Sequence, residues 1–316
     1  MEPSSESLTG SDPAAVMRRF VLATRPKFFT ASVLPVVLGT VQGALAANGA
    51  DLPIFLLALG ATVFVHAAAN VLNDVYDDKN GTDARNTQRI YPYTGGSRFI
   101  QNAVIGAAAM ARLGWGLLAV GVVLGGVLTV AKGVIVIVFG VAGVSLGVFY
   151  STPPLWLSAR GLGEFAVGLA FGVLPVVGAA WLQTGAVEPD AVLVSIPVAL
   201  WVVNVLLIDE VPDAAADAAV GRRTLAVRLG RTGTARLYFA LSVAAAATVA
   251  LAVVLAVIPI WAAAVSAGLL WPAAKAMRAI RTGTGQPNAM KRAIEWTLAV
   301  HAIGTTLLIA ALLAPR

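Results

Sequence analysis

The chain has 316 residues, of which 58% are hydrophobic and only 12% are charged, and its net charge is +6. Its mean hydropathy of +0.83 lies far outside the range of soluble globular domains and indicates a membrane protein with several spans. Because the sequence contains no cysteine, disulfides, thiolate catalysis, iron–sulfur clusters and cysteine-ligated zinc are excluded.

The N-terminal stretch "MEPSSESLTGSDPAA" is polar and acidic. It lacks the basic and apolar regions of a signal peptide, so residues 1–17 are expected to form a disordered cytoplasmic tail. Residues 18–316 are expected to fold as a single transmembrane domain.

Apolar segments of about 20 residues, the length that spans a bilayer, predict an all-α bundle of nine transmembrane helices. Only Pro259 separates the seventh segment from the eighth. The nine segments are 28–48, 52–76, 103–124, 130–150, 162–182, 190–210, 235–256, 258–277 and 294–314.

The basic residues indicate how this bundle is oriented. All 22 Lys and Arg residues except Lys132 and Arg316 fall on one side of the nine-helix arrangement. Lys and Arg accumulate on the cytoplasmic side of short loops, which predicts a cytoplasmic N-terminus and a C-terminus outside. Since topology accounts for the positive net charge, no nucleic-acid partner is expected.

The second predicted helix runs into an acidic segment, "NVLNDVYDDKNGTDARN", at residues 70–86. Four of its polar residues are spaced at offsets 0, 3, 4 and 7, which places them on one face of a continuing helix. A further aspartate follows just past the end of that helix. We call these residues the first cluster: Asn70, Asn73, Asp74, Asp77 and Asp83.

The sixth predicted helix runs into a similar segment, "LLIDEVPDAAADAAVGRRTLAVRLG". Asp209, Asp213 and Asp217 recur there at four-residue intervals and form the second cluster, again on one helix face. Each cluster ends a predicted cytoplasmic helix and is followed by a glycine and then by basic residues. The acidic residues of both clusters could instead be solvated ends of helices outside the lipid. The recurrence of the same pattern in two places favours a shared site.

Stacked carboxylates repel one another unless a cation lies between them. Carboxylate and amide oxygens are hard ligands that suit Mg²⁺, which usually binds one or two carboxylates together with substrate phosphates. Two facing clusters therefore predict a Mg²⁺ site for a diphosphate.

These segments resemble the UbiA superfamily of membrane prenyltransferases. The matching stretches are "NDVYDDKNGTD", "DEVPDAAADAAVGRRTLAVRLG", "RPKFFTASVLPVVLGT", "YSTPP" and "RGLGEFAVGLAFGVLP". The stretches "RPK", "TGGSR" and "RGLGE" are most similar to the branch that contains the 1,4-dihydroxy-2-naphthoate polyprenyltransferases of menaquinone synthesis. The resemblance implies Mg²⁺-dependent transfer of a polyprenyl group from a polyprenyl diphosphate to an aromatic acceptor, in the cell (inner) membrane, at a site facing the cytoplasm.

The resemblance also implies roles for the first cluster. Asn73, Asp77 and Asp83 would bind Mg²⁺ and diphosphate, with Asp74 as a further ligand and Asn70 on the diphosphate side.

From the second cluster the resemblance implies Asp213 and Asp217 as metal ligands. Many relatives have Asn where this chain has Asp209, and Glu210 beside it adds a further acid, so the role of Asp209 as a ligand stays open. Asp77 and Asp213 are expected to be essential for turnover.

Ionisation of an allylic diphosphate needs positive charge at the leaving group. Five basic residues are candidates, with topology as the alternative explanation for each: Lys27, Arg85, Arg98, Arg222 and Arg223. Tyr150, within "YSTPP", is the aromatic residue predicted to stabilise the carbocation by a cation–π contact.

Several alternatives stay open at this point. The acceptor is expected to be 1,4-dihydroxy-2-naphthoate, but 4-hydroxybenzoate, another acceptor or a terpene cyclase reaction without an acceptor are possible on the same scaffold.

Arg160 and Glu164 suit either the acceptor side or a helix-start pair. His66 is interpreted as a hydrogen-bonded interior histidine. An ion-coupled transporter is disfavoured, because transporters place their sites near the bilayer midplane. The sequence does not indicate an oligomeric state.

Overall fold

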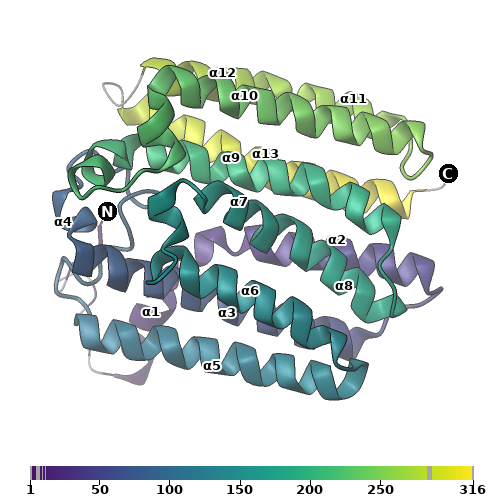
Figure 1. Cartoon of the computed structure of the whole chain (residues 1–316), viewed down its shortest axis with the longest axis horizontal. Coiled ribbons are helices and arrows are strands. Elements are labelled where there is room, and N and C mark those ends of the chain that lie inside the picture. The colour runs from purple at the N-terminus through teal and green to yellow at the C-terminus, as the bar shows by residue number, and fades with distance from the viewer. Residues whose placement is uncertain (1, 5–7, 9, 11, 283–286, 315–316) are drawn as a thin grey trace.

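The computed structural model describes residues 2–4, 8, 10, 12–282 and 287–314. Within these residues all regular structure is helical, and the long helices lie side by side along one direction (Figure 1). The helices of the first half are α1 (Pro13–Ala23), η1 (Pro26–Phe28), α2 (Thr30–Ala46), α3 (Leu52–Asn80), α4 (Thr82–Arg85), α5 (Ala107–Lys132) and α6 (Ile135–Ser151). Those of the second half are η2 (Leu157–Arg160), α7 (Gly163–Val167), η3 (Gly168–Val173), α8 (Leu174–Thr184), α9 (Pro189–Ala219), α10 (Leu225–Val254), α11 (Trp261–Gly268), α12 (Leu270–Thr282) and α13 (Pro287–Leu313).

The all-helical membrane fold is confirmed, but the number of nine spans is not. Seven of the described helical stretches are long and apolar enough to cross a membrane, and the 17-residue α6 is apolar but shorter. Over the predicted eighth span, 258–277, the chain forms α11 and α12, which follow one another across Leu269, a residue with right-handed helical φ and ψ. Each of the two helices, taken singly, is shorter than a bilayer span.

The outer surface of the bundle is apolar over long stretches. Large aliphatic side chains such as Val130, Val138, Val254 and Ile260 are well exposed. Contiguous apolar surface of this kind is unfavourable in water and is expected where lipid surrounds the protein. The chain is therefore a multi-pass membrane protein.

Small residues allow the central helices to approach closely. A Cβ atom on Gly39 of α2 would lie 2.1 Å from the carbonyl oxygen of Val176 in α8. One on Gly172 of η3 would lie 2.3 Å from the Cα of Ala199 in α9. Glycine at such contacts lets helix backbones touch, which is the usual way membrane helices pack.

α3 and α9 carry the two clusters, and both are longer than predicted. α3 continues past the expected end at residue 76 to Asn80, where Gly81 adopts a left-handed conformation with a φ of 80° and ends the helix. α9 continues past residue 210 to Ala219. α4 packs against α9, which brings the ends of α3 and α9 to the same end of the bundle (Figure 1).

Other boundaries also differ from the prediction. α5 covers Ala107–Lys132, where 103–124 was expected. α10 begins at Leu225, ten residues before the expected start, where the side chain of Thr224 caps it by accepting a hydrogen bond from Val227 N at 3.3 Å. Its first turn is separated from the rest by a kink at Gly230, which has a φ of 62°.

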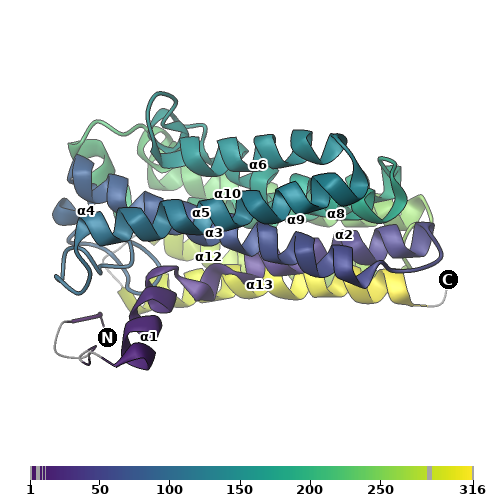
Figure 2. The same cartoon turned by 90° about the horizontal axis from the view of Figure 1, so that it is seen from below.

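The two ends of the chain lie at opposite ends of the bundle (Figure 1). α1 begins at Pro13, so its first turn falls within the stretch 1–17 expected to be a tail, and it lies beside the bundle (Figure 2). Lys132 lies at the end remote from the clusters, where it pairs with Asp51 at 3.0 Å. Arg316 lies outside the described residues.

Candidate active site

The first cluster lines one side of a cavity of about 750 Å³. Asn70, Asn73 and Asp77 face this cavity from α3, and Asp83 faces it from α4. The amide of Asn73 donates hydrogen bonds to Asp77 Oδ2 at 2.9 Å and to Ser151 Oγ at 3.0 Å. These contacts fix the orientation of Asp77 from α3 itself and from the end of α6.

Asp74, in contrast, does not line the cavity. Its carboxylate accepts hydrogen bonds from the guanidinium of Arg25 and from the backbone N–H of Ser97. Arg25 lies in the turn between α1 and η1 with a φ of 56°, and its side chain lines the cavity. Burial opposes the charge of Arg25, but Asp74, Asp83 and Asp77 outweigh it and raise the pKa of the guanidinium.

Asp83 is nearly buried at the edge of the cavity. Its side chain accepts a hydrogen bond from Gln101 Nε2 at 3.3 Å, and its carbonyl oxygen accepts one from Arg98 Nη1 at 2.7 Å. Burial, followed by the charges of Asp77 and Asp74, raises the pKa of the Asp83 carboxyl well above its usual range. A cation bound beside Asp83 would stabilise the charged form of its carboxyl, which burial and the neighbouring aspartates disfavour.

The second cluster faces the same cavity from α9. Asp213 is held by two groups of the loop after α4: Asn86 Nδ2 donates to its Oδ1 at 2.6 Å, and Gly95 N donates to its Oδ2 at 3.1 Å. Asp209 and Asp217 line the cavity one turn before and one turn after Asp213. The loop after the first cluster therefore binds directly to the second cluster.

Arg222 joins the two clusters. Its Nη1 lies 3.0 Å from Asp77 Oδ1 and 3.2 Å from Asp217 Oδ1. The side chain is largely buried and lines the cavity. Burial opposes its charge, but Asp77 and Asp217 outweigh that cost and raise the pKa of the guanidinium above its usual value.

The other four basic residues singled out from the sequence do not line the cavity. Arg85 is exposed and donates to the carbonyl of Gly81, and exposed Lys27 lies over the Tyr93 ring at 5.9 Å. Arg98 is buried against the carbonyl of Asp83, and the Arg223 side chain is exposed. The structure brings Arg222 and the unexpected Arg25 to the cavity instead.

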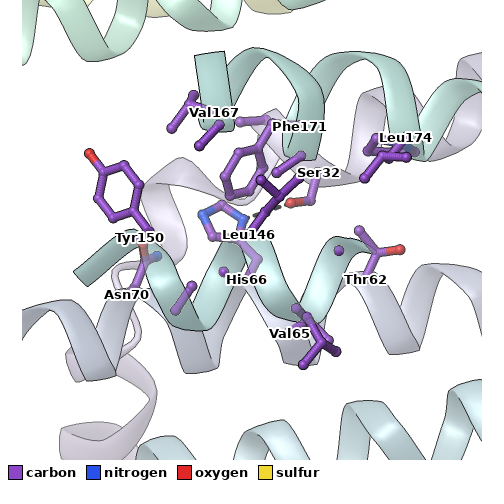
Figure 3. Close-up of a pocket in the computed structure, with 18 of the residues that line it drawn as sticks. Ser32, Thr62, Val65, His66, Asn70, Leu146, Tyr150, Val167, Phe171 and Leu174 are labelled. Carbon is purple, nitrogen blue, oxygen red and sulfur yellow. Dashed lines mark hydrogen bonds between the residues drawn. The ribbon is translucent and has the colours of Figure 1, made fainter. Parts of the chain in front are cut away.

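The cavity changes from polar to apolar along its length. Tyr150, at the end of α6, lines it next to the polar end. Deeper in the bundle the lining consists of apolar side chains, among them Val136, Trp181 and Leu182. Figure 3 shows the intermediate region, where the Phe171 ring lies against His66 and Tyr150 lies to one side of them. Such a cavity suits a ligand with a charged head and a long apolar tail.

The donor set fits Mg²⁺, provided that a substrate supplies further oxygens. Within the described residues, no three carboxylate or imidazole groups lie close enough to form a metal cage by themselves. However, Asp209 Oδ1 and Glu210 Oε2 are buried without a hydrogen-bond partner in that part of the chain. Buried carboxylate oxygens without partners are costly, and Mg²⁺ commonly combines a few carboxylates with phosphate oxygens.

Arg160 and Glu164 have structural partners. Arg160 Nη2 donates to the carbonyl of Pro154 at 3.0 Å, and Glu164 Oε1 accepts from Leu225 N at 3.2 Å. Neither residue lines the cavity, whereas Glu210 does. The sequence signals that pointed to this region were the acid beside Asp209 and the "RPK" stretch that begins at Arg25, but neither specified which side chain turns inward.

The sequence is similar to those of known proteins. A sequence model of the UbiA prenyltransferase family matches residues 32–299. The 1,4-dihydroxy-2-naphthoate octaprenyltransferase of Bacillus subtilis is 29% identical over 218 residues, which cover 68% of this chain and 67% of that protein. The Haemophilus influenzae protein of the same name is 31% identical over 245 residues, covering 74% and 76% of the two chains.

Solved structures show the same fold. The structure of a UbiA homolog from Archaeoglobus fulgidus bound to DMAPP and Mg²⁺ superimposes with a TM-score of 0.62. The alignment covers 94% of this chain and 99% of that chain at 16% sequence identity. At this identity the likeness concerns the fold alone.

Proposed function

The chain belongs to the UbiA prenyltransferase family, and on that basis we propose that it transfers a polyprenyl group from a polyprenyl diphosphate to 1,4-dihydroxy-2-naphthoate in menaquinone synthesis. Family membership makes it a transferase of alkyl groups other than methyl groups. The observation that carries the proposal is the meeting of two aspartate clusters and Arg222 at the polar mouth of a cavity that becomes apolar.

In this proposal the diphosphate binds between the two clusters. Arg222 and Arg25 are the basic residues beside it, and each guanidinium presents several donors to phosphate oxygens. Both are held by aspartates in the free protein. Binding of the diphosphate would therefore exchange carboxylate partners for phosphate partners at a site where the arginines are already oriented.

Mg²⁺ is the proposed cofactor, held by Asp77 and Asp83 of the first cluster and by Asp213 and Asp217 of the second. When bound with the diphosphate, it would offset the negative charge that develops on the leaving group. The amide oxygen of Asn73 and the carboxylate of Asp209 are further oxygens at the same end of the cavity. Asp74, occupied by Arg25 and Ser97, holds Arg25 in place.

The allylic carbon then lies beside Tyr150. As the C1–O bond of the diphosphate breaks, positive charge grows on the allylic carbon, and the electron-rich face of a tyrosine ring stabilises such charge. The apolar walls exclude water, which would otherwise capture the cation. The polyprenyl tail occupies the deeper part of the cavity, lined by Val136, Trp181 and Leu182.

The acceptor is proposed from the relatives. Two proteins similar to this chain are named as 1,4-dihydroxy-2-naphthoate octaprenyltransferases. The ring carbon that bears the carboxylate would attack the allylic carbon, and diphosphate would leave. The bond from that ring carbon to the carboxylate would then break, so that CO₂ leaves and its electron pair restores the aromatic ring. The product has the carbon skeleton of demethylmenaquinone.

One experiment separates this proposal from its alternatives. Purified protein, Mg²⁺ and a polyprenyl diphosphate are incubated with each acceptor labelled at its carboxylate. We expect labelled CO₂ from the naphthoate. Prenylated 4-hydroxybenzoate that retains its label, without naphthoate turnover, would reassign the acceptor. Diphosphate release without acceptor, accompanied by a cyclic hydrocarbon, would instead indicate a terpene cyclase.

We also propose that the site faces the cytoplasm of a cell (inner) membrane. The basic residues gathered at the cluster end of the bundle support this orientation.

A further inference from the structure

His66 occupies a position between the polar and apolar parts of the cavity. It lies on α3 four residues before Asn70 and eleven before Asp77. At 1.5 Å per residue it is about 6 Å from Asn70 and about 16 Å from Asp77 along the helix axis. It lines the cavity although only 5% of its surface is exposed.

The imidazole is held in one orientation by three neighbours. Ser32 Oγ, from α2, lies 2.7 Å from Nδ1 of His66 and is fully buried. The ring of Phe171 contacts the imidazole edge-on with a centroid distance of 4.6 Å (Figure 3). The ring of Phe29 does so with a centroid distance of 5.3 Å. Phe171 belongs to η3, a π-helical segment, and such segments are frequent at functional sites.

The second ring nitrogen, Nε2, has no hydrogen-bond partner among the described residues. This nitrogen is open to the cavity, where a ligand in mostly apolar surroundings would gain a hydrogen bond from it. The polyprenyl tail offers only C–H groups, and the oxygen ligands proposed for the diphosphate end begin at Asn73, about 10 Å from His66 along α3. The hydroxyl groups of an aromatic acceptor are the remaining polar groups of the reaction. A hydroxyl suits either tautomer of His66, because it both donates and accepts hydrogen bonds.

We propose that His66, oriented by Ser32, hydrogen-bonds a ring hydroxyl of the aromatic acceptor and so positions the ring for attack on the allylic carbon. This inference rests on the proposed function, because it requires an aromatic acceptor with a free hydroxyl. The acceptor would lie between Tyr150 and the Phe29–His66–Phe171 group, with its flat faces against apolar side chains.

The test uses variants that separate the two nitrogens of the ring. His66→Asn keeps a polar group near Ser32 but removes the group that reaches the cavity, whereas His66→Gln reaches the position of Nε2. We expect kcat/KM for the dihydroxynaphthoate to fall about tenfold in His66→Asn, the effect of losing one hydrogen bond of about 1.4 kcal/mol. His66→Gln should recover part of this loss, and the KM for the polyprenyl diphosphate should stay within about twofold of the wild type in both.

A naphthoate analogue that lacks one ring hydroxyl provides a second measurement. Because a missing ring hydroxyl also lowers the nucleophilicity of the ring, the two compounds are compared by their dissociation constants. The wild type should bind the analogue about tenfold more weakly than the parent acceptor, and His66→Asn should lose that discrimination. His301→Asn is the matched control, because His301 is the other histidine of the chain, is buried in α13 and does not line the cavity. It should keep the wild-type discrimination.

The inference would be overturned if wild type and His66→Asn discriminated equally between the acceptor and its analogue. A change confined to the KM for the polyprenyl diphosphate would also overturn it, and would assign His66 to the isoprenoid chain. If the wild type turns over 4-hydroxybenzoate instead, the same ratios are measured with benzoate as the analogue. Absence of turnover with any aromatic acceptor in the wild type would reject the proposed function itself, which distinguishes the two failures.

Discussion

Arg222 lies 3.0 Å from Asp77 across 145 positions of sequence, and this ion pair joins the two aspartate clusters. It draws the segment after α9 against α3 and places a buried cation at the mouth of the cavity. The same guanidinium also pairs with Asp217. The free protein thus has a positive charge where the proposed reaction develops negative charge on the leaving group.

Replacing Arg222 should reduce turnover strongly. We expect Arg222→Ala to lower kcat/KM about 100-fold, the effect of losing roughly 2.7 kcal/mol of charge-assisted hydrogen bonding in a largely buried site. Arg222→Lys should retain part of the activity, since it keeps the charge but not the two-pronged geometry. Arg223→Ala is the matched control, because Arg223 is adjacent to Arg222 but is exposed and does not line the cavity. Steady-state kinetics should show a change in kcat/KM below about threefold for this variant. Similar losses at both positions would argue against the proposed role.

The two clusters should depend on their cavity-facing carboxylates. Asp77→Asn and Asp213→Asn should each abolish product formation while the proteins stay folded and inserted in the membrane. Asp78→Asn is the control, since Asp78 is adjacent to Asp77 but accepts a hydrogen bond from Gln101 and does not line the cavity. Product analysis by chromatography measures all three. Turnover near the wild-type rate in either cluster variant would contradict a mechanism that uses both.

Removal of divalent metal should stop the reaction reversibly. With EDTA we expect no product, because the carboxylates would repel the diphosphate without a metal between them. Added Mg²⁺ should restore the full rate. Turnover that persists in metal-free buffer would show that the arginines stabilise the diphosphate leaving group without a metal.

The orientation of the bundle can be tested with single cysteines, because the chain contains none. Thr87 and Thr232 are exposed at the cluster end, in the loop after α4 and near the start of α10. Cysteines at both positions should resist a membrane-impermeant maleimide in intact cells and react after permeabilisation. Labelling of either one from outside would reverse the predicted topology.

Close packing of α2 on α8 should be sensitive to one methyl group. A Cβ on Gly39 meets the backbone of Val176, so Gly39→Ala should destabilise the fold by about 1–3 kcal/mol through overpacking. Gly116→Ala in α5 is the control, because a Cβ there meets nothing within 4 Å. Thermal denaturation in detergent should show a lower Tm for the first variant only. Equal Tm values for the two variants would mean that α2 and α8 accommodate the added methyl group without loss of stability.

The sequence by itself determined the class of fold and both aspartate clusters. Apolar segments indicate membrane helices because the thickness of the bilayer sets the length of a span. A four-residue spacing indicates a shared helix face because it follows from the local geometry of the helix. Asp77, Asp83, Asp213 and Asp217 line one cavity, and their roles there stay a prediction. The division of 258–277 into α11 and α12 was not visible, because a single apolar stretch does not show where a helix stops.

Only the tertiary structure decided which charged side chains turn inward. Asp74 and Asp77 belong to one stripe of α3, yet they lie about 60° apart around the helix, and packing directs the first to Arg25 and the second to the cavity. Arg25 enters the site through a left-handed turn, while neighbouring Lys27 stays exposed. Arg222 meets Asp77 only because α3 and α9 end together, a contact that depends on residues far apart in the chain.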